Sequence, residues 1–230
     1  MKPTRRPVIP PPIAVPAPPS DVTALDPLLE SWPAGKTLRR CFDAAWGSRQ
    51  FYAGDQAHRG RFHPLRPVGR ATDLPVLYAA DSQIGALSET VCHDVPVRGV
   101  KVVPYAKLWH RLIVDLEPVR ELRLVDLRTL GLRRLGVSRV ELIESDPRSY
   151  ADTAAWARAL HDHPIAVDGL LWVSRQHDSS EAVVLFGDRV DSGELRLVPG
   201  HVPLVLGEGS GLDLVSRVAD DAGITIANLP

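Results

Sequence analysis

The stretch VDGLLWVSRQHDSSEAVVLFGD, residues 167–188, carries the pattern that decides the fold. Two apolar runs, VDGLLWVS (167–174) and EAVVLFGD (181–188), flank the polar segment RQHDSS (175–180). Each run has the length of a strand and the continuous apolar composition of a strand buried on both faces. The short connection predicts that the two strands are neighbours in one sheet.

Further strands and helices are predicted on both sides of this pair. Strands are expected at 37–42, 74–80, 108–116, 122–127 and 203–209, and helices at 82–94, 149–162 and 212–223. Residues 132–143 are expected to form either a short helix or a turn followed by a helix. Ser82 is a typical N-cap, and Gly223 is a typical helix end. Strands and helices do not alternate strictly, so the pattern predicts an α+β protein with a compact mixed sheet and flanking helices.

The composition divides the chain into three parts. Residues 1–36 form a Pro-rich arm, which is either a disordered tail or an arm that packs across the domain. Residues 37–190 are expected to hold the catalytic domain, and residues 191–230 a strand–helix extension packed on it. The irregular segment 47–73 is dense in Gly, Arg and His, and a segment of this length without regular structure is typically disordered or functional.

Composition also excludes several classes of protein. The chain of 230 residues is 44% hydrophobic with a net charge of −1, so it lacks the basic surplus of proteins that bind nucleic acids or anionic membranes. No apolar run approaches the roughly 20 residues of a membrane span. Prolines interrupt the N-terminus where a signal peptide needs an apolar helix. The isolated Cys41 and Cys92 fit a reducing compartment, so a cytoplasmic protein is expected.

No compact catalytic motif is present. The sequence has no Walker loop, no GxGxxG after a strand, no GxSxG elbow and no HExxH. His161 and His163 do not share a helix face, and no third ligand is indicated, so no metal site is predicted. A site must therefore be assembled from scattered residues.

Five residues are candidates for such a site: Arg40, Arg61, Tyr78, Glu89 and Ser174. Glu89 falls opposite the apolar stripe of its predicted helix and is either solvated or a carboxylate that faces a cleft. Arg61 is either a surface residue or a guanidinium fork for a carboxylate or phosphate. Arg40 lies in a strand, where alternation allows it to point inward toward an anion. Tyr78 is either a core residue or a stacking surface, and Ser174 alone is uninformative.

Taken together, these residues resemble the RES domain, a family that is named for an Arg, a Glu and a Ser spread along the chain. The matching segments are LRRCF with Arg40, RGRFHP with Arg61, PVLYAADSQIGALSE with Tyr78 and Glu89, and DGLLWVSRQHDSSEAVVLF with Ser174. The resemblance covers about residues 37–190. Family members have Asn before the last strand, where this chain has Glu181 nearby.

The resemblance implies a fold and a function. RES proteins are similar to toxins of two-gene toxin–antitoxin pairs, and their fold resembles that of ADP-ribosyltransferase toxins. They degrade NAD⁺ by phosphorolysis or hydrolysis, and some ADP-ribosylate a protein. NAD⁺ is thus expected as a substrate and not as a bound cofactor, with inorganic phosphate as a co-substrate. The expected partner is an antitoxin with a helix-turn-helix that plugs the active site, and a homodimer is the default for such an enzyme.

The same resemblance gives each candidate a role. Cleavage of the nicotinamide–ribose bond creates positive charge on the ribose, which Glu89 would stabilise. Arg61 and Arg40 would hold the pyrophosphate, Tyr78 would stack on nicotinamide or ribose, and Ser174 would hydrogen-bond the nicotinamide riboside end. Three alternatives stay open: a protein ADP-ribosyltransferase, a non-catalytic interaction protein, and a nucleic-acid binder that uses RRLGVSR (133–139), which the neutral net charge disfavours.

Overall fold

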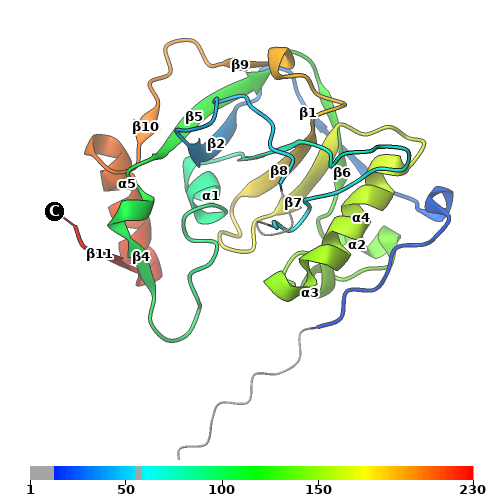
Figure 1. Cartoon of the computed structure of the whole chain (residues 1–230), viewed down its shortest axis with the longest axis horizontal. Coiled ribbons are helices and arrows are strands. Elements are labelled where there is room, and N and C mark those ends of the chain that lie inside the picture. Colours follow the sequence, from blue (N-terminus) through cyan, green and yellow to red (C-terminus); the bar gives the residue numbers. More distant parts are fainter. Residues whose placement is uncertain (1–12, 55–58, 230) are drawn as a thin grey trace, which may run out of the picture.

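The computed structural model describes residues 13–54 and 59–229, and its centre is a mixed sheet of nine strands (Figure 1). The strand order is β1-β6-β7-β8-β3-β2-β5-β10, and β9 also pairs with β5. The pair β6–β7 is parallel, and the other pairs of this sheet are antiparallel. The strands are β1 (Leu29–Trp32), β2 (Leu38–Asp43), β3 (Val76–Ala80), β5 (Arg111–Pro118), β6 (Leu122–Asp126), β7 (Gly169–Val173), β8 (Glu181–Phe186), β9 (Leu195–Leu197) and β10 (Leu204–Val205).

Helices and a second small sheet complete the fold. The α-helices are α1 (Gln83–Ser88), α2 (Thr129–Leu135), α3 (Arg139–Leu142), α4 (Tyr150–Asp162) and α5 (Gly209–Ala222). The short strands β4 (Val102–Pro104) and β11 (Thr225–Ala227) pair in parallel. The predicted α+β class with a mixed sheet is confirmed. Within the described residues, no helix combines the length and the apolar character needed to cross a membrane.

The sheet curls, and one apolar core contains residues from strands near both ends of the sheet. Trp32 of β1 and Leu195 of β9 are fully buried in the same cluster, although their strands lie far apart in the strand order. Leu171 and Val183, which face each other across β7 and β8, lie in the middle of this cluster. The two strands predicted as neighbours therefore form the centre of the sheet, which explains their continuous apolar sequence.

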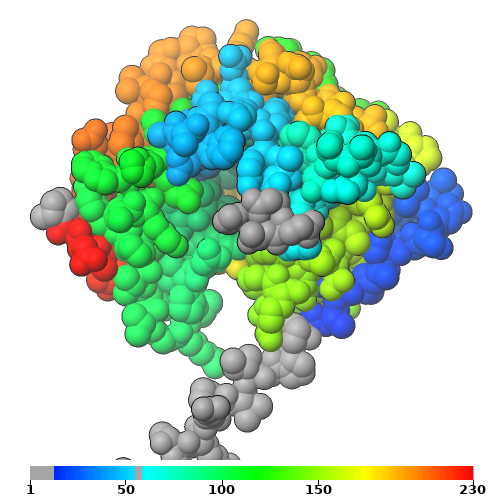
Figure 2. All heavy atoms as spheres, viewed as in Figure 1, coloured from blue at the N-terminus to red at the C-terminus, as the bar shows by residue number. Residues whose placement is uncertain are grey.

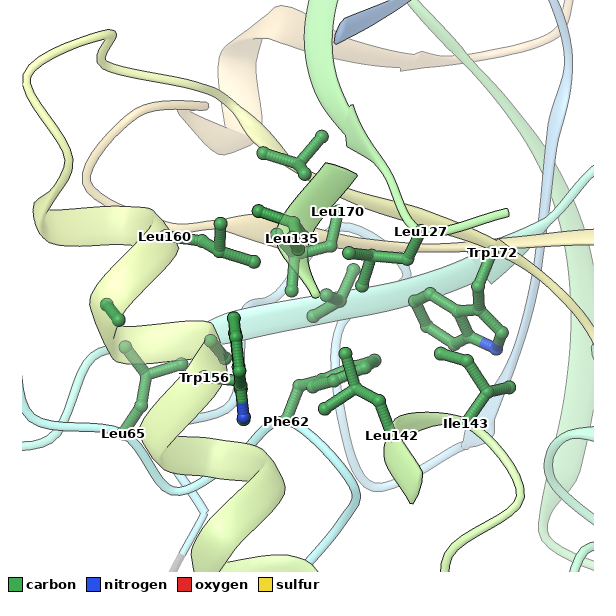
Figure 3. Close-up of a cluster of buried hydrophobic side chains, with 14 of the residues drawn as sticks. Phe62, Leu65, Leu127, Leu135, Leu142, Ile143, Trp156, Leu160, Leu170 and Trp172 are labelled. Carbon is green, nitrogen blue, oxygen red and sulfur yellow. The ribbon is translucent and has the colours of Figure 1, made fainter. Parts of the chain in front are cut away.

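The opposite face of the sheet is covered by two groups of helices. Over one half, α2, α3 and α4 bury a cluster that includes Phe62, Trp156, Leu160 and Trp172 (Figure 3). Over the other half, α1 and α5 pack with β5 on a separate cluster that includes Leu87. Between these two helix groups, the β3–α1 connection contacts the β7–β8 connection through a hydrogen bond between the hydroxyls of Ser82 and Ser180.

Element boundaries differ from the sequence prediction in physically understandable ways. The predicted helix 82–94 is regular only to Ser88. Of the two alternatives for 132–143, the turn followed by a helix agrees with the structure, since Gly136, with φ of 71°, ends α2 in the left-handed conformation before α3 begins. The end of α5 at Gly223, with φ of 63°, is confirmed. The strands β1, β4, β9 and β11 were not predicted, because runs of three or four residues carry no clear periodicity.

The described part of the N-terminal arm packs against α4. Val15 and Leu25 are buried in the α4 cluster, and the indole Nε1 of Trp156 donates a hydrogen bond to the Pro16 carbonyl at 2.7 Å.

We expect Trp156→Phe to lower the free energy of unfolding by about 1–2 kcal/mol, since this hydrogen bond and part of the ring contact are lost. Urea denaturation measures the change. Trp46→Phe, at a side chain that is 45% exposed, is the control and should change it by less than about 0.5 kcal/mol. Equal effects would contradict the packing of the arm.

Candidate active site

Helix α1 begins close to the β7–β8 connection, and this contact places Glu89. The Ser82 hydroxyl accepts from the Gly85 amide at 2.9 Å, as predicted for an N-cap, and also hydrogen-bonds the Ser180 hydroxyl. A Cβ on Gly85 would lie 2.7 Å from Ser180 atoms, so glycine permits this close approach. Glu89 is the C-cap of α1 and therefore lies beside the end of β7.

Ser174 fixes the Glu89 carboxylate. Its side chain is fully buried, and its hydroxyl donates to Glu89 Oε1 at 2.5 Å. The same oxygen accepts from the amides of Gln176 at 3.1 Å and His177 at 3.2 Å. One donor and two acceptor positions are thus used within the protein, which is the full capacity of a hydroxyl group. Ser174 is arranged to orient Glu89, and it has no free proton for a ligand in this geometry.

Tyr78 ties the irregular segment to the same face of the sheet. Its hydroxyl accepts from the Phe62 amide at 3.1 Å and lies 3.0 Å from His63 Nδ1. Its ring lies edge-on to Trp172 at 6.2 Å, and burial raises the pKa of the phenol. Tyr78 therefore anchors the segment that carries Arg61.

Arg61 is buried without a carboxylate partner. It is 4% exposed, and its Nη1 donates to the Ser145 hydroxyl at 2.9 Å and to the Leu142 carbonyl at 3.3 Å. The guanidinium carbon lies 5.4 Å from the centre of the Tyr150 ring. Burial lowers the pKa of Arg61, and Glu89 is close enough to oppose that shift. The structure thus brings Arg61 to the group formed by Tyr78, Glu89 and Ser174.

Arg40 does not join this group. Arg39 pairs with Ala80 and shares the face of Tyr78, so Arg40 points to the other face, inside the curl. There it donates to the Ser48 carbonyl at 2.9 Å, and burial lowers its pKa to about 10. Arg40 and Arg61 share no hydrogen-bond partner among the described residues, and the expectation that both hold one pyrophosphate stays a prediction.

Three residues near Glu89 were missed by the sequence analysis. Arg175 donates to the carbonyls of Ser145 and His93, and His93 Nε2 lies 3.1 Å from the Tyr150 hydroxyl. The side chain of Arg175 could not be placed from strand alternation, because the chain turns immediately after β7. His93 and Tyr150 lie in segments whose sequence carries no motif, so no local signal marks them.

Arg175 joins two segments that border a hollow in the surface, because it donates to the His93 carbonyl after α1 and to the Ser145 carbonyl before α4. Figure 2 shows a notch between the green segment after α1 and the yellow-green segment that leads into α4. A cavity of about 390 Å³ lies against α5, and its lining includes Ser88, Cys92, Gln176 and His177 but neither Arg61 nor Glu89. Since Arg175 connects the two segments beside the notch, we take the notch as the candidate site. Among the described residues, no cluster of His, Cys, Asp and Glu side chains could hold a metal ion.

Glu181, the first residue of β8, pairs with basic side chains. Glu181 accepts from Arg128 Nη1 at 2.6 Å and lies 3.7 Å from Lys36 Nζ. This glutamate is therefore part of an ion-pair network with Arg128 that also includes Asp126 and Glu30.

Comparison with known proteins identifies the family. A search of curated proteins finds no match to this chain. The fold is similar to that of a chain in the crystal structure of the M. tuberculosis MbcT–MbcA toxin–antitoxin complex, with a TM-score of 0.57 and 17% sequence identity over 84% of this chain and 92% of that chain. The family model of the RES domain matches residues 37–206, which is most of the sequence. The chain belongs to the RES-domain family.

Proposed function

We propose that this chain cleaves NAD⁺ at the bond between nicotinamide and ribose. The observation that carries the proposal is the position of the Glu89 carboxylate. The fully buried Ser174 hydroxyl donates to Glu89 Oε1 at 2.5 Å, and Glu89 lies within electrostatic reach of Arg61, which forms no ion pair among the described residues. A fixed carboxylate suits a reaction in which positive charge develops on a ribose, because it is already oriented when the charge appears. Membership of the RES family supports the same activity, and the proposed likeness to ADP-ribosyltransferases agrees with it.

In the proposed reaction, the bond between ribose C1′ and the nicotinamide nitrogen breaks, and both of its electrons leave with neutral nicotinamide. Glu89 stabilises the resulting oxocarbenium-like charge on the ribose. A water acceptor forms the new bond to C1′ and releases a proton to the solvent, whereas an anionic phosphate oxygen forms that bond without losing a proton. Arg61 would hold a phosphate group of the substrate, and the edge of Tyr78 would border the nicotinamide riboside.

The proposed role of Ser174 changes with the structure. We assign Ser174 as a positioning residue for Glu89, since its hydroxyl group is fully used by Glu89 and two backbone amides. Ser174→Ala is expected to lower kcat by on the order of 10-fold to 100-fold, because a carboxylate that loses its orientation loses catalytic geometry. KM for NAD⁺ should stay within about twofold, since ground-state binding is retained.

A matched control is available in the same turn. Ser179 is exposed, and Ser179→Ala should leave kcat unchanged. Melting temperatures of both variants separate a catalytic loss from unfolding. A Ser174→Ala enzyme with wild-type kcat would contradict the positioning role.

The nucleophile is tested by identifying the product. If water is the acceptor, we expect incubation with NAD⁺ in phosphate-free buffer to yield ADP-ribose. If phosphate is the acceptor, we expect NAD⁺ to be consumed only when phosphate is added, and the product to be a phosphorylated ADP-ribose. Transfer of label from NAD⁺ to a protein would assign the chain as an ADP-ribosyltransferase, which needs the same donor site. Intact NAD⁺ under all three conditions would contradict the proposed function.

We further propose that the chain is the toxin of a toxin–antitoxin pair and acts in the cytoplasm, where NAD⁺ is present. Its family and its fold similarity to a chain of a toxin–antitoxin complex support this role. The proposed partner is a helix-turn-helix antitoxin that covers the notch. Expression of the chain alone should lower cellular NAD⁺ and stop growth, and Glu89→Gln should abolish both effects.

A further inference from the structure

On the basis of the proposed function, we propose that Arg175 binds a phosphate group together with Arg61. The two guanidinium groups would form one anion site for phosphate oxygens. The source of that phosphate is either the diphosphate of NAD⁺ or free inorganic phosphate that acts as the acceptor. Four observations on the two arginines support this assignment.

The first observation is that a single buried residue anchors both arginines. Ser145 is 2% exposed; its hydroxyl accepts from Arg61 Nη1 at 2.9 Å, and its carbonyl accepts from Arg175 Nη1 at 3.3 Å. Arg61 comes from the irregular segment and Arg175 from the β7–β8 turn, so two distant parts of the chain meet at this point. The two side chains are thus held close together by the fold.

The second observation is that neither arginine has a carboxylate as a hydrogen-bond partner, although Asp146 lies within electrostatic reach of Arg175 and Glu89 within reach of Arg61. The partners of Arg175 are the carbonyls of Ser145 and His93, the latter at 3.2 Å from Nη2, and those of Arg61 are a hydroxyl and a carbonyl. Among the described residues, neither arginine forms an ion pair. Two such cations held side by side are costly in a protein unless an anion joins them.

The structural arginines of this protein are different. Arg120 pairs with Asp168 at 2.9 Å and with Glu194 at 2.6 Å. Arg128 pairs with carboxylates of three residues in the network described above. Arg40, Arg61 and Arg175 instead donate to carbonyl or hydroxyl oxygens. Arg61 and Arg175 differ from Arg40 because both are anchored at Ser145.

The third observation is that each of the two arginines has a buried N–H group without an acceptor. Arg61 Nη2 and Arg175 Nε have no hydrogen-bond partner within the described structure. Buried donors are normally satisfied, and an unsatisfied N–H on a charged group is especially unfavourable. A tetrahedral phosphate offers several acceptor oxygens and can accept from two guanidinium groups together.

The fourth observation is the position of this pair relative to the proposed chemistry. Ser174 and Arg175 are consecutive, and Ser174 holds Glu89. Burial lowers the pKa of Arg61, and the charge of Arg175 adds to that effect while Glu89 opposes it, so the three groups lie within electrostatic reach. An anion bound by the arginines would lie close to the ribose that Glu89 is proposed to stabilise.

Calorimetric titration of the full chain with inorganic phosphate and with ADP-ribose tests the assignment without any need for turnover. Arg175→Gln should weaken binding of at least one of these probes by on the order of 10-fold to 100-fold, because charge-assisted hydrogen bonds are lost. Arg175→Lys keeps the charge and should recover part of the affinity. Arg196→Gln is the control, since Arg196 is exposed and paired with Glu117 at 2.6 Å.

The two probes distinguish the source of the phosphate. Weaker binding of ADP-ribose alone assigns the pair to the diphosphate, and weaker binding of inorganic phosphate alone assigns it to the acceptor. Unchanged affinity of Arg175→Gln for both probes, or no binding of either probe by the wild-type chain, would overturn the assignment. Melting temperatures confirm that the variants are folded. If the chain does not cleave NAD⁺ but still binds the anions in a way that depends on Arg175, the proposed reaction is overturned and the anion site is supported.

Discussion

Glu89→Gln is expected to lower kcat for NAD⁺ cleavage by on the order of 10²–10³-fold. Glutamine has nearly the same size and can still accept the hydrogen bond of the Ser174 hydroxyl, so the local packing is preserved. What it removes is the negative charge that is proposed to stabilise the ribosyl cation. Because this stabilisation arises only in the transition state, KM for NAD⁺ should change little. Initial rates of nicotinamide release measure both constants.

The matched control for this substitution is Glu121→Gln. Glu121 is exposed and precedes β6, which runs parallel to β7, so the same change of charge is made at the opposite end of these strands from Ser174. Its kcat should remain within about twofold of the wild-type value. A Glu89→Gln enzyme that keeps more than about a tenth of the wild-type kcat would argue against a charge-stabilising role for Glu89.

Trp172→Ala is expected to lower the free energy of unfolding by about 3–5 kcal/mol. Trp172 is 1% exposed and lies on the helix-covered face of β7, with its ring 5.1 Å from Phe62 and 6.2 Å from Tyr78. Alanine would leave a large cavity under α3 and α4, in the cluster that Figure 3 shows. It would also remove support from Tyr78, which anchors the segment that carries Arg61.

Trp172→Phe provides a second variant with a different expectation. The indole Nε1 of Trp172 is buried without a hydrogen-bond partner in the described part of the chain, so its removal relieves a cost while most of the ring contact remains. The loss should therefore be smaller, at about 1–2 kcal/mol. Urea denaturation followed by circular dichroism measures both variants. Equal destabilisation by Phe and Ala would contradict the cavity argument.

The centre of the fold was predictable from local sequence, because each feature there is set by residues close in the chain. The apolar runs of β7 and β8 are continuous, since both faces of the sheet are covered. Ser82 caps α1 and Gly223 ends α5 for reasons that depend only on their own backbone positions. The helical spacing of apolar residues predicted burial less reliably. Ile84 and Leu87 fall on one apolar face of the predicted helix 82–94, but Ile84 is 38% exposed and lines the cavity against α5.

The arrangement of the site could be predicted only in part. Tyr78 and Glu89 were expected in one site because the resemblance to the RES family rests on a single segment that contains both residues. Which of two adjacent arginines in β2 faces Tyr78 depends on the register of β2 with β3, which no local pattern gives. The position of Arg175 depends on the turn after β7, where the alternation of a strand ends. Such residues are found only once the tertiary structure places their partners.

The proposed cleavage is tested most directly by incubation of the purified chain with NAD⁺, followed by chromatographic measurement of nicotinamide. We expect release of nicotinamide in an amount equal to the NAD⁺ consumed, with loss of this activity in Glu89→Gln and its retention in Glu121→Gln. NAD⁺ that stays intact with and without phosphate, or nicotinamide release that is equally fast in Glu89→Gln, would contradict this expectation.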